Sequence, residues 1–181
     1  GCTAIPSGVC VVENFDIHRY QGTWYEIARL DHCFERGLTN VSATYTPRDD
    51  GSIAVNNRGY DPKSNRWKSM QGRAYLVDKA GKGRLKVTFF WPFYGAYNVI
   101  ALDRDAYSYA MVCGPSRKYL WILSREKVLP VFVLDDLVSE ALRLRFRVED
   151  LISVPQHLSP SVPDAEVNPD RYNHTEKGPK P

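Results

Sequence analysis

The chain has 181 residues, of which 43% are apolar and 25% charged, with a formal net charge of +3. This composition excludes a collagen-like or wholly disordered chain, and one domain is the expectation at this length. So small a charge gives no reason to expect a nucleic-acid partner, and no apolar run reaches the roughly 18 residues of a membrane-spanning helix. Aromatic residues are the unusual component, at 12%.

The chain begins with Gly1-Cys2-Thr3. Gly-Cys is the junction at which a bacterial lipoprotein signal peptide ends and the lipid-bearing cysteine begins. We therefore expect Cys2 to be a lipid attachment site and residues 1–8 to act as a tether. The alternative is that these first residues remain from a cleaved expression tag.

Short runs rich in Val, Ile, Tyr, Phe and Thr then alternate with turn sequences such as Asp49-Asp50-Gly51. The predicted strands are 23–30, 41–46, 52–60, 69–77, 84–90, 97–102, 107–113 and 119–124. Short loops favour antiparallel pairing between neighbours, and eight such strands lose their free edges by closing into a barrel that can hold one small ligand. The predicted fold class is all-β, an eight-stranded up-and-down antiparallel barrel.

After Pro130 the apolar spacing changes to three and four residues, which predicts one flanking α-helix over about 131–146. Its apolar face is expected to pack against the outside of the sheet. From Pro155 onward the chain is polar and rich in proline, so residues 155–181 are predicted to form a disordered tail. The domain is therefore expected to span residues 9–154.

Two motifs bracket the predicted barrel. Gly22-Thr23-Trp24 enters the first strand after a short helical turn, and Arg125 follows the last strand. They resemble the Gly-x-Trp and arginine elements of the lipocalin family. The resemblance implies a barrel floor built from Gly22, Trp24 and Arg125, with the guanidinium stacked on the indole.

Three longer segments, 29–38, 89–95 and 113–125, are similar to the bacterial lipocalins, outer-membrane lipoproteins related to apolipoprotein D. That resemblance implies a lipid-binding barrel on the periplasmic side of an outer membrane. The sequence departs from the pattern at Trp91, at Cys10 and Cys33, and in its longer tail. These departures concern loop shape and disulfide pattern.

Alternation along the strands extends the motifs to a candidate ligand-binding site. An inward Trp24 predicts that Glu26, Ala28 and Leu30 also face the lumen, and an inward Arg125 predicts the same for Leu123 and Trp121. The resemblance to the apolipoprotein D pocket implies inward Tyr45, Asn57, Phe89, Tyr97 and Trp121. Alternation then adds Val41, Ala43, Val55, Leu85, Val87 and Val99. This lining suits a lipid or similar amphiphile.

The alternative is that these side chains simply fill the barrel. Small inward residues such as Ala28, Ala43 and Gly59 favour a cavity. The carboxylate of Glu26 is costly in an apolar lumen unless it is paired or its pKa is raised. It is therefore a candidate either for contact with a ligand headgroup or for a structural hydrogen bond near the floor.

The four cysteines favour an oxidising compartment. Resemblance to apolipoprotein D implies a disulfide between Cys10 and Cys113, while a Cys33–Cys113 bridge and no bridge are the alternatives. A free Cys33 near the barrel mouth raises the possibility of a thiol-dependent lipid enzyme. No metal-ligand spacing or phosphate-binding glycine loop is present, so we expect no metal, no cofactor and no enzymatic activity.

We therefore predict a protein that binds, stores or transports fatty acids or lysophospholipids for cell-envelope maintenance, anchored in the outer membrane through its N-terminus. The resemblance also allows a homodimer. Besides the thiol enzyme, the remaining alternative is an interaction module with a filled barrel, which would dock a partner through the loop that carries Trp91, Phe93 and Tyr94.

Overall fold

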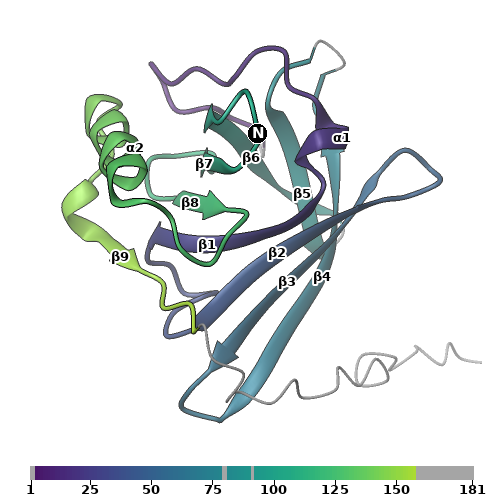
Figure 1. Cartoon of the computed structure of the whole chain (residues 1–181). Helices are drawn as coiled ribbons and strands as arrows, with labels where there is room; N and C mark the ends of the chain where they lie inside the picture. The colour runs from purple at the N-terminus through teal and green to yellow at the C-terminus, as the bar shows by residue number, and fades with distance from the viewer. Residues whose placement is uncertain (1–2, 79–80, 91, 158–181) are drawn as a thin grey trace, which may run out of the picture.

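The computed structural model describes residues 3–78, 81–90 and 92–157 (Figure 1). Its elements, in chain order, are α1 (Ile17–Tyr20), β1 (Gly22–Leu30), β2 (Thr39–Pro47), β3 (Ile53–Asp61), β4 (Arg66–Leu76), β5 (Arg84–Phe90), β6 (Phe93–Leu102), β7 (Tyr109–Cys113), β8 (Leu120–Ser124), α2 (Val131–Arg143), a 3-10 turn (Val148–Asp150) and β9 (Leu151–Ser153). Neither α-helix in these ranges is long and apolar enough to cross a membrane.

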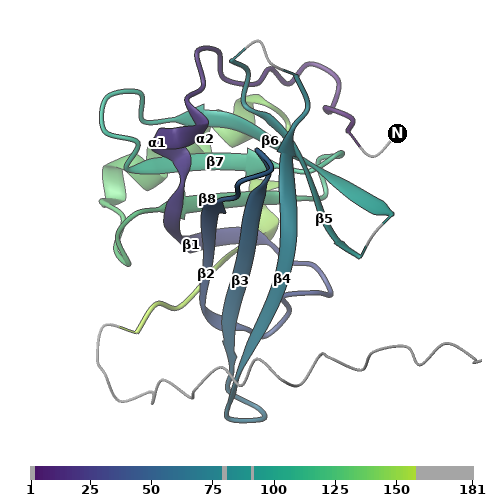
Figure 2. The same ribbon diagram turned by 90° about the vertical axis from the view of Figure 1, so that its right-hand side faces the viewer.

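The strands β1 to β8 form a closed antiparallel barrel. Each strand pairs with the next along the chain, and β1 closes the cylinder by pairing with both β2 and β8. Figures 1 and 2 show the strands curving around one interior, with α2 lying outside against β7, β8 and β1. The predicted fold class is confirmed, including the single C-terminal flanking helix.

Two apolar cores lie on the two faces of the sheet. The inner core fills the barrel around Trp24, Val99 and Val112. The outer core packs Leu137 and Ala141 of α2 against the outward side chains of β1, β6, β7 and β8. Since adjacent side chains on a strand point to opposite faces, one sheet supports both cores.

A β-bulge in β1 changes which side chains enter the barrel. Glu26 pairs with the inward Leu123, but Ala28 pairs with the outward Ile122, because the register shifts between Glu26 and Ala28. The extra residue reverses the alternation, so Ala28 and Leu30 belong to the outer core beneath α2. The expected inward placement of these two residues is therefore wrong. Arg29, which pairs with Trp121, faces the lumen instead.

The C-terminal segment fills the gap that this bulge leaves between β1 and β2. The two strands pair only over residues 22–25 of β1, and β9 pairs with residues 28–30. The side-chain amide of Gln156 donates hydrogen bonds to the carbonyl oxygens of Glu26 (2.8 Å) and Val41 (2.9 Å). The expected start of the tail at Pro155 is thus too early, since the Pro155 carbonyl also accepts from Asn40 N–H. The rest of the predicted tail, residues 158–181, lies outside the described residues.

The N-terminal segment crosses the outside of the barrel without the expected disulfide. Asn98 donates to the Ala4 carbonyl oxygen (3.0 Å), which fixes the segment beside β6. Cys113 is buried in the outer core, whereas Cys10 and Cys33 are exposed, and all three are free thiols. The predicted Cys10–Cys113 bridge is wrong, because Cys113 is buried in the outer core beneath α2 while Cys10 is exposed, and both thiols are free. Cys2 lies outside the described residues.

Candidate functional site

One end of the barrel is closed by the two sequence motifs. The Arg125 guanidinium lies 3.8 Å from the centre of the Trp24 ring, a cation–π contact on a fully buried indole. Arg125 also donates three hydrogen bonds to carbonyl oxygens, those of Arg19 (2.8 Å), Thr23 (3.1 Å) and Tyr107 (3.2 Å). Gly22 enters β1 at φ +94°, and a Cβ there would lie 3.3 Å from Arg125. We call this closed end the floor.

The lumen next to the floor is filled by side chains. Trp24, Ala74, Ala110, Val99 and Val112 all have an exposed fraction of 0%. The helical turn α1 and the residues before it add aromatic rings to this packing. No space for a ligand is left at the floor, so this half of the barrel interior is a protein core.

The lumen toward the other end is not filled. Six inward residues keep accessible surface although they lie inside the barrel: Ala43, Asn57, Val87, Phe89, Tyr97 and Trp121. Of the other expected lining residues, Tyr45, Val55, Leu85 and Val99 belong to the buried inner core, and Val41 is buried as well. An inward side chain stays accessible only where the lumen contains space, so the barrel is open on this side. We call this end the mouth.

Three tyrosine hydroxyls mark the boundary between the filled and the open lumen. Tyr97 shares a hydrogen bond of 2.6 Å with Tyr20 and accepts one of 3.1 Å from Tyr45. Burial raises the pKa of all three phenols, so they stay neutral. The indole N–H of Trp24 donates to the Tyr20 carbonyl oxygen (2.8 Å), which connects this cluster to the floor.

A buried charged network lies at the mouth, which we call the mouth cluster: Glu26, Arg29, His32, Glu35 and Trp121. Arg29 forms an ion pair with Glu26 at 3.1 Å and donates to the Glu35 carbonyl oxygen at 2.7 Å. The Glu35 carboxylate contacts His32 Nε2 (2.7 Å) and accepts from the Trp121 indole N–H (3.1 Å). The network thereby folds the β1–β2 loop back onto the barrel rim.

The two carboxyl groups of the mouth cluster have opposite protonation preferences. Burial raises the pKa of Glu26 well above its usual value, and the nearby Glu35 charge raises it further, while Arg29 opposes the shift. Burial also acts to raise the pKa of Glu35, but hydrogen bonds from His32 and Trp121 outweigh it and leave that pKa lowered. Glu35 is therefore the ionised member and Glu26 the member that holds a proton most readily.

Two polar atoms of the mouth cluster lack partners. Arg29 Nε and His32 Nδ1 are buried and make no hydrogen bond within the described part of the chain. A buried polar atom without a partner is unfavourable by about 1–3 kcal/mol, more when it is charged. Their position beside the open lumen makes them available to a polar group of a bound molecule.

Sequence reasoning placed Glu26 and Trp121 in the lumen but missed Arg29, His32 and Glu35. Regular alternation would send Arg29 outward, and only the bulge brings it in. His32 and Glu35 lie on a loop, where periodicity carries no information. Their spacing of three residues, a histidine and an acid on one turn, was the available signal. Among the described residues no group of three or more His, Cys, Asp or Glu could hold a metal ion.

Comparison with known proteins places this geometry in a family. A lipocalin-like domain model matches residues 15–156. The chain belongs to the lipocalin family. Lipocalins have a fold that binds small hydrophobic ligands, in agreement with a barrel closed at the floor and open at the mouth.

Several curated lipocalins are similar over most of their length. The outer membrane lipoprotein Blc of Citrobacter freundii is 54% identical over 151 residues, covering 83% of this chain and 85% of the relative. Its namesake in Vibrio cholerae is 47% identical over 156 residues, covering 86% and 91%. Apolipoprotein D of Macaca fascicularis is 34% identical over 142 residues, covering 74% and 71%. The predicted family and the predicted localisation as an outer membrane lipoprotein are confirmed by these relatives.

Solved lipocalin structures share the fold at low sequence identity. Insecticyanin from the tobacco hornworm Manduca sexta superimposes with a TM-score of 0.67 at 21% identity, covering 88% of this chain and 89% of its own. The cockroach allergen Per a 4 gives 0.67 at 19% identity, covering 88% and 98%. At these identities the likeness concerns the barrel architecture alone.

Proposed function

We propose that this lipocalin binds a fatty acid or lysophospholipid, with the acyl chain in the open lumen and the headgroup at the mouth cluster. The observation that carries the proposal is the set of partly exposed inward residues, mostly apolar, that stops at the tyrosine cluster. An acyl chain would remove their apolar surface from water, which is favourable by about 25 cal/mol per Å². Ala28 is not part of this proposed site, since it packs beneath α2.

The mouth cluster supplies the polar half of the proposed site. The unpartnered Arg29 Nε is a charged donor suited to a carboxylate or phosphate oxygen. The raised pKa of Glu26 reduces the negative charge beside Arg29, so an anionic headgroup meets less repulsion there than from an ordinary carboxylate. We therefore assign Arg29 and His32 to headgroup contact and Glu26 to positioning of Arg29.

We further propose that binding serves storage or transport of lipid during envelope maintenance, on the periplasmic face of the outer membrane and with Cys2 acylated. Support comes from the relatives, which are named outer membrane lipoproteins. Acyl chains on one N-terminal cysteine would hold the barrel at the membrane from which its ligand comes. Homodimerisation stays a prediction.

The proposed role is non-enzymatic. Cys33 is exposed on the β1–β2 loop. The imidazole of the adjacent His32 contacts Glu35 through Nε2 and packs edge-on to Trp121. Because this histidine is held by the mouth cluster, it supports a structural or binding role better than activation of a thiol. Cys33→Ser is expected to leave lipid affinity unchanged.

The test is a titration of the full chain with a fluorescent fatty acid, followed by competition with a lysophospholipid. Saturable binding at one site is expected, with a change in Trp121 fluorescence. Arg29→Gln should weaken binding about tenfold, the cost of losing a charge-assisted hydrogen bond. The matched control is Arg36→Gln, since Arg36 lies on the nearby β1–β2 loop but its guanidinium is exposed and paired with Asp31. Equal losses in both variants, or absence of saturable binding, would contradict the proposal.

A further inference from the structure

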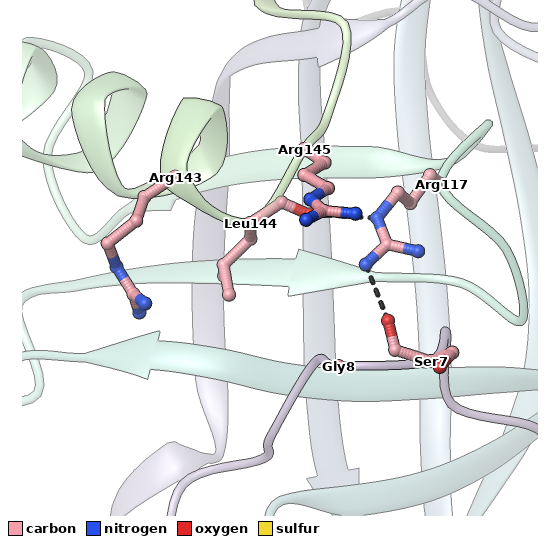
Figure 3. A pocket seen from close by; sticks show the side chains of 6 residues that line it. All are labelled: Ser7, Gly8, Arg117, Arg143, Leu144 and Arg145. Atoms are coloured by element: carbon pink, nitrogen blue, oxygen red, sulfur yellow. Dashed lines mark hydrogen bonds between the residues drawn. The ribbon is translucent and has the colours of Figure 1, made fainter.

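A second concave site lies on the outside of the barrel, away from the lumen. It is a pocket of about 300 Å³ between the C-terminal end of α2 and the N-terminal segment (Figure 3). Its lining residues are Ser7, Gly8, Arg117, Arg143, Leu144 and Arg145. Three of the six are arginines and none is acidic, so the pocket is strongly basic in a chain whose net charge is only +3.

Arg117 is held in place by both walls of this pocket. Its Nε donates to the Leu144 carbonyl oxygen at the end of α2 (2.8 Å), and its Nη2 donates to the Ser7 carbonyl oxygen (2.6 Å). Figure 3 shows the Arg117 guanidinium beside the end of α2, with its hydrogen bond to Ser7 of the N-terminal segment drawn as a dashed line. The positive charge is therefore preorganised, because little side-chain entropy remains to be lost when an anion binds.

Cations at a helix C-terminus have an ordinary structural explanation, since they stabilise its last carbonyl groups. Arg117 caps Leu144 in this way, and Arg143 forms a two-pronged ion pair with Glu140 at 2.8 and 2.5 Å. Arg145 does not fit this explanation. Its guanidinium makes no hydrogen bond or ion pair within residues 3–78, 81–90 and 92–157.

The backbone of Arg145 adds a second observation. It adopts φ +65° just beyond the C-cap Leu144 of α2, where Arg145 N–H bonds to the Leu142 carbonyl and Phe146 N–H to the Ala141 carbonyl. Glycine is the usual residue at this position, and another residue is strained there by about 1 kcal/mol. The chain thus holds an arginine in an unfavourable conformation and directs its unpaired charge at the pocket.

We propose that this pocket binds a phosphate group. A cluster of guanidinium groups provides several N–H donors in the planar geometry that phosphate oxygens accept, and arginine is favoured over lysine at such sites. The phosphate would be presented either by an anionic phospholipid headgroup or by free phosphate, which share the same oxygens. This site is separate from the lumen, so the proposal does not depend on lipid binding in the barrel.

The test uses the full chain and two substitutions, Arg145→Gly and Arg147→Gly. Arg147 is a matched control because it lies two residues away, is exposed, is absent from the pocket lining and is paired with Glu149 and Asp150. One arm measures binding of inorganic phosphate by calorimetry. The other measures sedimentation with phosphatidylcholine vesicles that do or do not contain phosphatidylglycerol.

Arg145→Gly should weaken binding about tenfold and should not lower the melting temperature, since glycine relieves the strained φ angle. Arg147→Gly should bind as the unsubstituted chain does. If Arg145→Gly loses binding only to the vesicles, the bound phosphate group belongs to a lipid headgroup. If it loses binding only to inorganic phosphate, the ligand is free phosphate. Equal binding by the two variants in both arms, or no binding by the unsubstituted chain, would overturn the proposal.

Discussion

The floor and the mouth of the barrel each contain one inward arginine, and the two guanidinium groups differ in how completely they are hydrogen-bonded. Arg125 at the floor lies over Trp24 and bonds to three carbonyl oxygens through Nε, Nη1 and Nη2. Arg29 at the mouth is more deeply buried, at 1% exposed, yet its Nε has no partner in the described residues. A buried arginine whose nitrogen atoms have hydrogen-bond partners stabilises the fold. A buried nitrogen atom without a partner marks a place where stability is given up for binding.

The apolar residues around the two arginines follow the same division. At the floor they are fully buried, and at the mouth they keep accessible surface. The lipocalin barrel therefore separates its two tasks along its axis. Substitutions at the floor should change the free energy of unfolding, and substitutions at the mouth should change ligand affinity or pH dependence.

The largest effect is expected for Trp24→Ala at the floor. Removing a fully buried indole leaves a cavity in the filled core and abolishes the contact with Arg125. The free energy of unfolding should fall by about 3–5 kcal/mol, measured by urea denaturation. A fall below about 1 kcal/mol would mean that the floor is not the stabilising end of the barrel.

Arg125→Met should have the next largest effect. The substitution keeps much of the side-chain volume but removes the cation–π contact and leaves the Arg19, Thr23 and Tyr107 carbonyl groups without this donor. We expect a loss of about 2 kcal/mol of unfolding free energy, with lipid affinity unchanged for the protein that remains folded. A selective loss of affinity would remove the distinction between floor and mouth.

Glu26→Gln should have a smaller effect that depends on pH. A carboxyl group whose pKa is raised by folding holds its proton longer in the folded than in the unfolded chain. The contribution of Glu26 to the free energy of unfolding is therefore fully present below the pKa of about 4.3 that it has in the unfolded chain. This contribution declines as the pH rises toward its pKa in the folded chain, with a limiting slope of about 1.4 kcal/mol per pH unit.

The glutamine variant lacks this group, so it should gain stability relative to the unsubstituted chain as the pH increases from about 4 to 8. Denaturation curves at several pH values measure the difference. The lowered pKa of Glu35 acts in the opposite direction, since its contribution is lost as the pH falls. If the unfolding free energies of the two proteins change in parallel with pH, folding does not raise the pKa of Glu26.

Short runs rich in strand-forming residues and hairpin turn sequences were sufficient to predict the eight strands and the closed barrel, and the three-and-four apolar spacing after Pro130 predicted the flanking helix. The floor could also be predicted, because Gly22, Trp24 and Arg125 lie in recognisable sequence motifs. The arrangement of the mouth could not be predicted, because it depends on a bulge whose position is set by pairing of β1 with β8 and β9. β9 is only three residues long, too short for a periodic signal.

The Cys10–Cys113 bridge was wrong for a related reason. A disulfide inferred from resemblance requires that both thiols approach each other, but Cys113 is buried beneath α2 while Cys10 is exposed. Strand patterning does indicate which face Cys113 occupies. It gives no information on the path of the N-terminal segment, which side-chain contacts from Arg84, Asn98 and Arg117 determine.

The most direct test of the division between floor and mouth is lipid titration of Val87→Trp beside Val131→Trp. Val87 is a partly exposed inward residue of the open lumen, and Val131 is 73% exposed on α2, outside the barrel. We expect tryptophan at 87 to occupy the ligand space and lower lipid affinity at least tenfold, with little change in melting temperature, while the substitution at 131 has no effect. Unchanged affinity in Val87→Trp would contradict the proposal that the open lumen is the lipid-binding site.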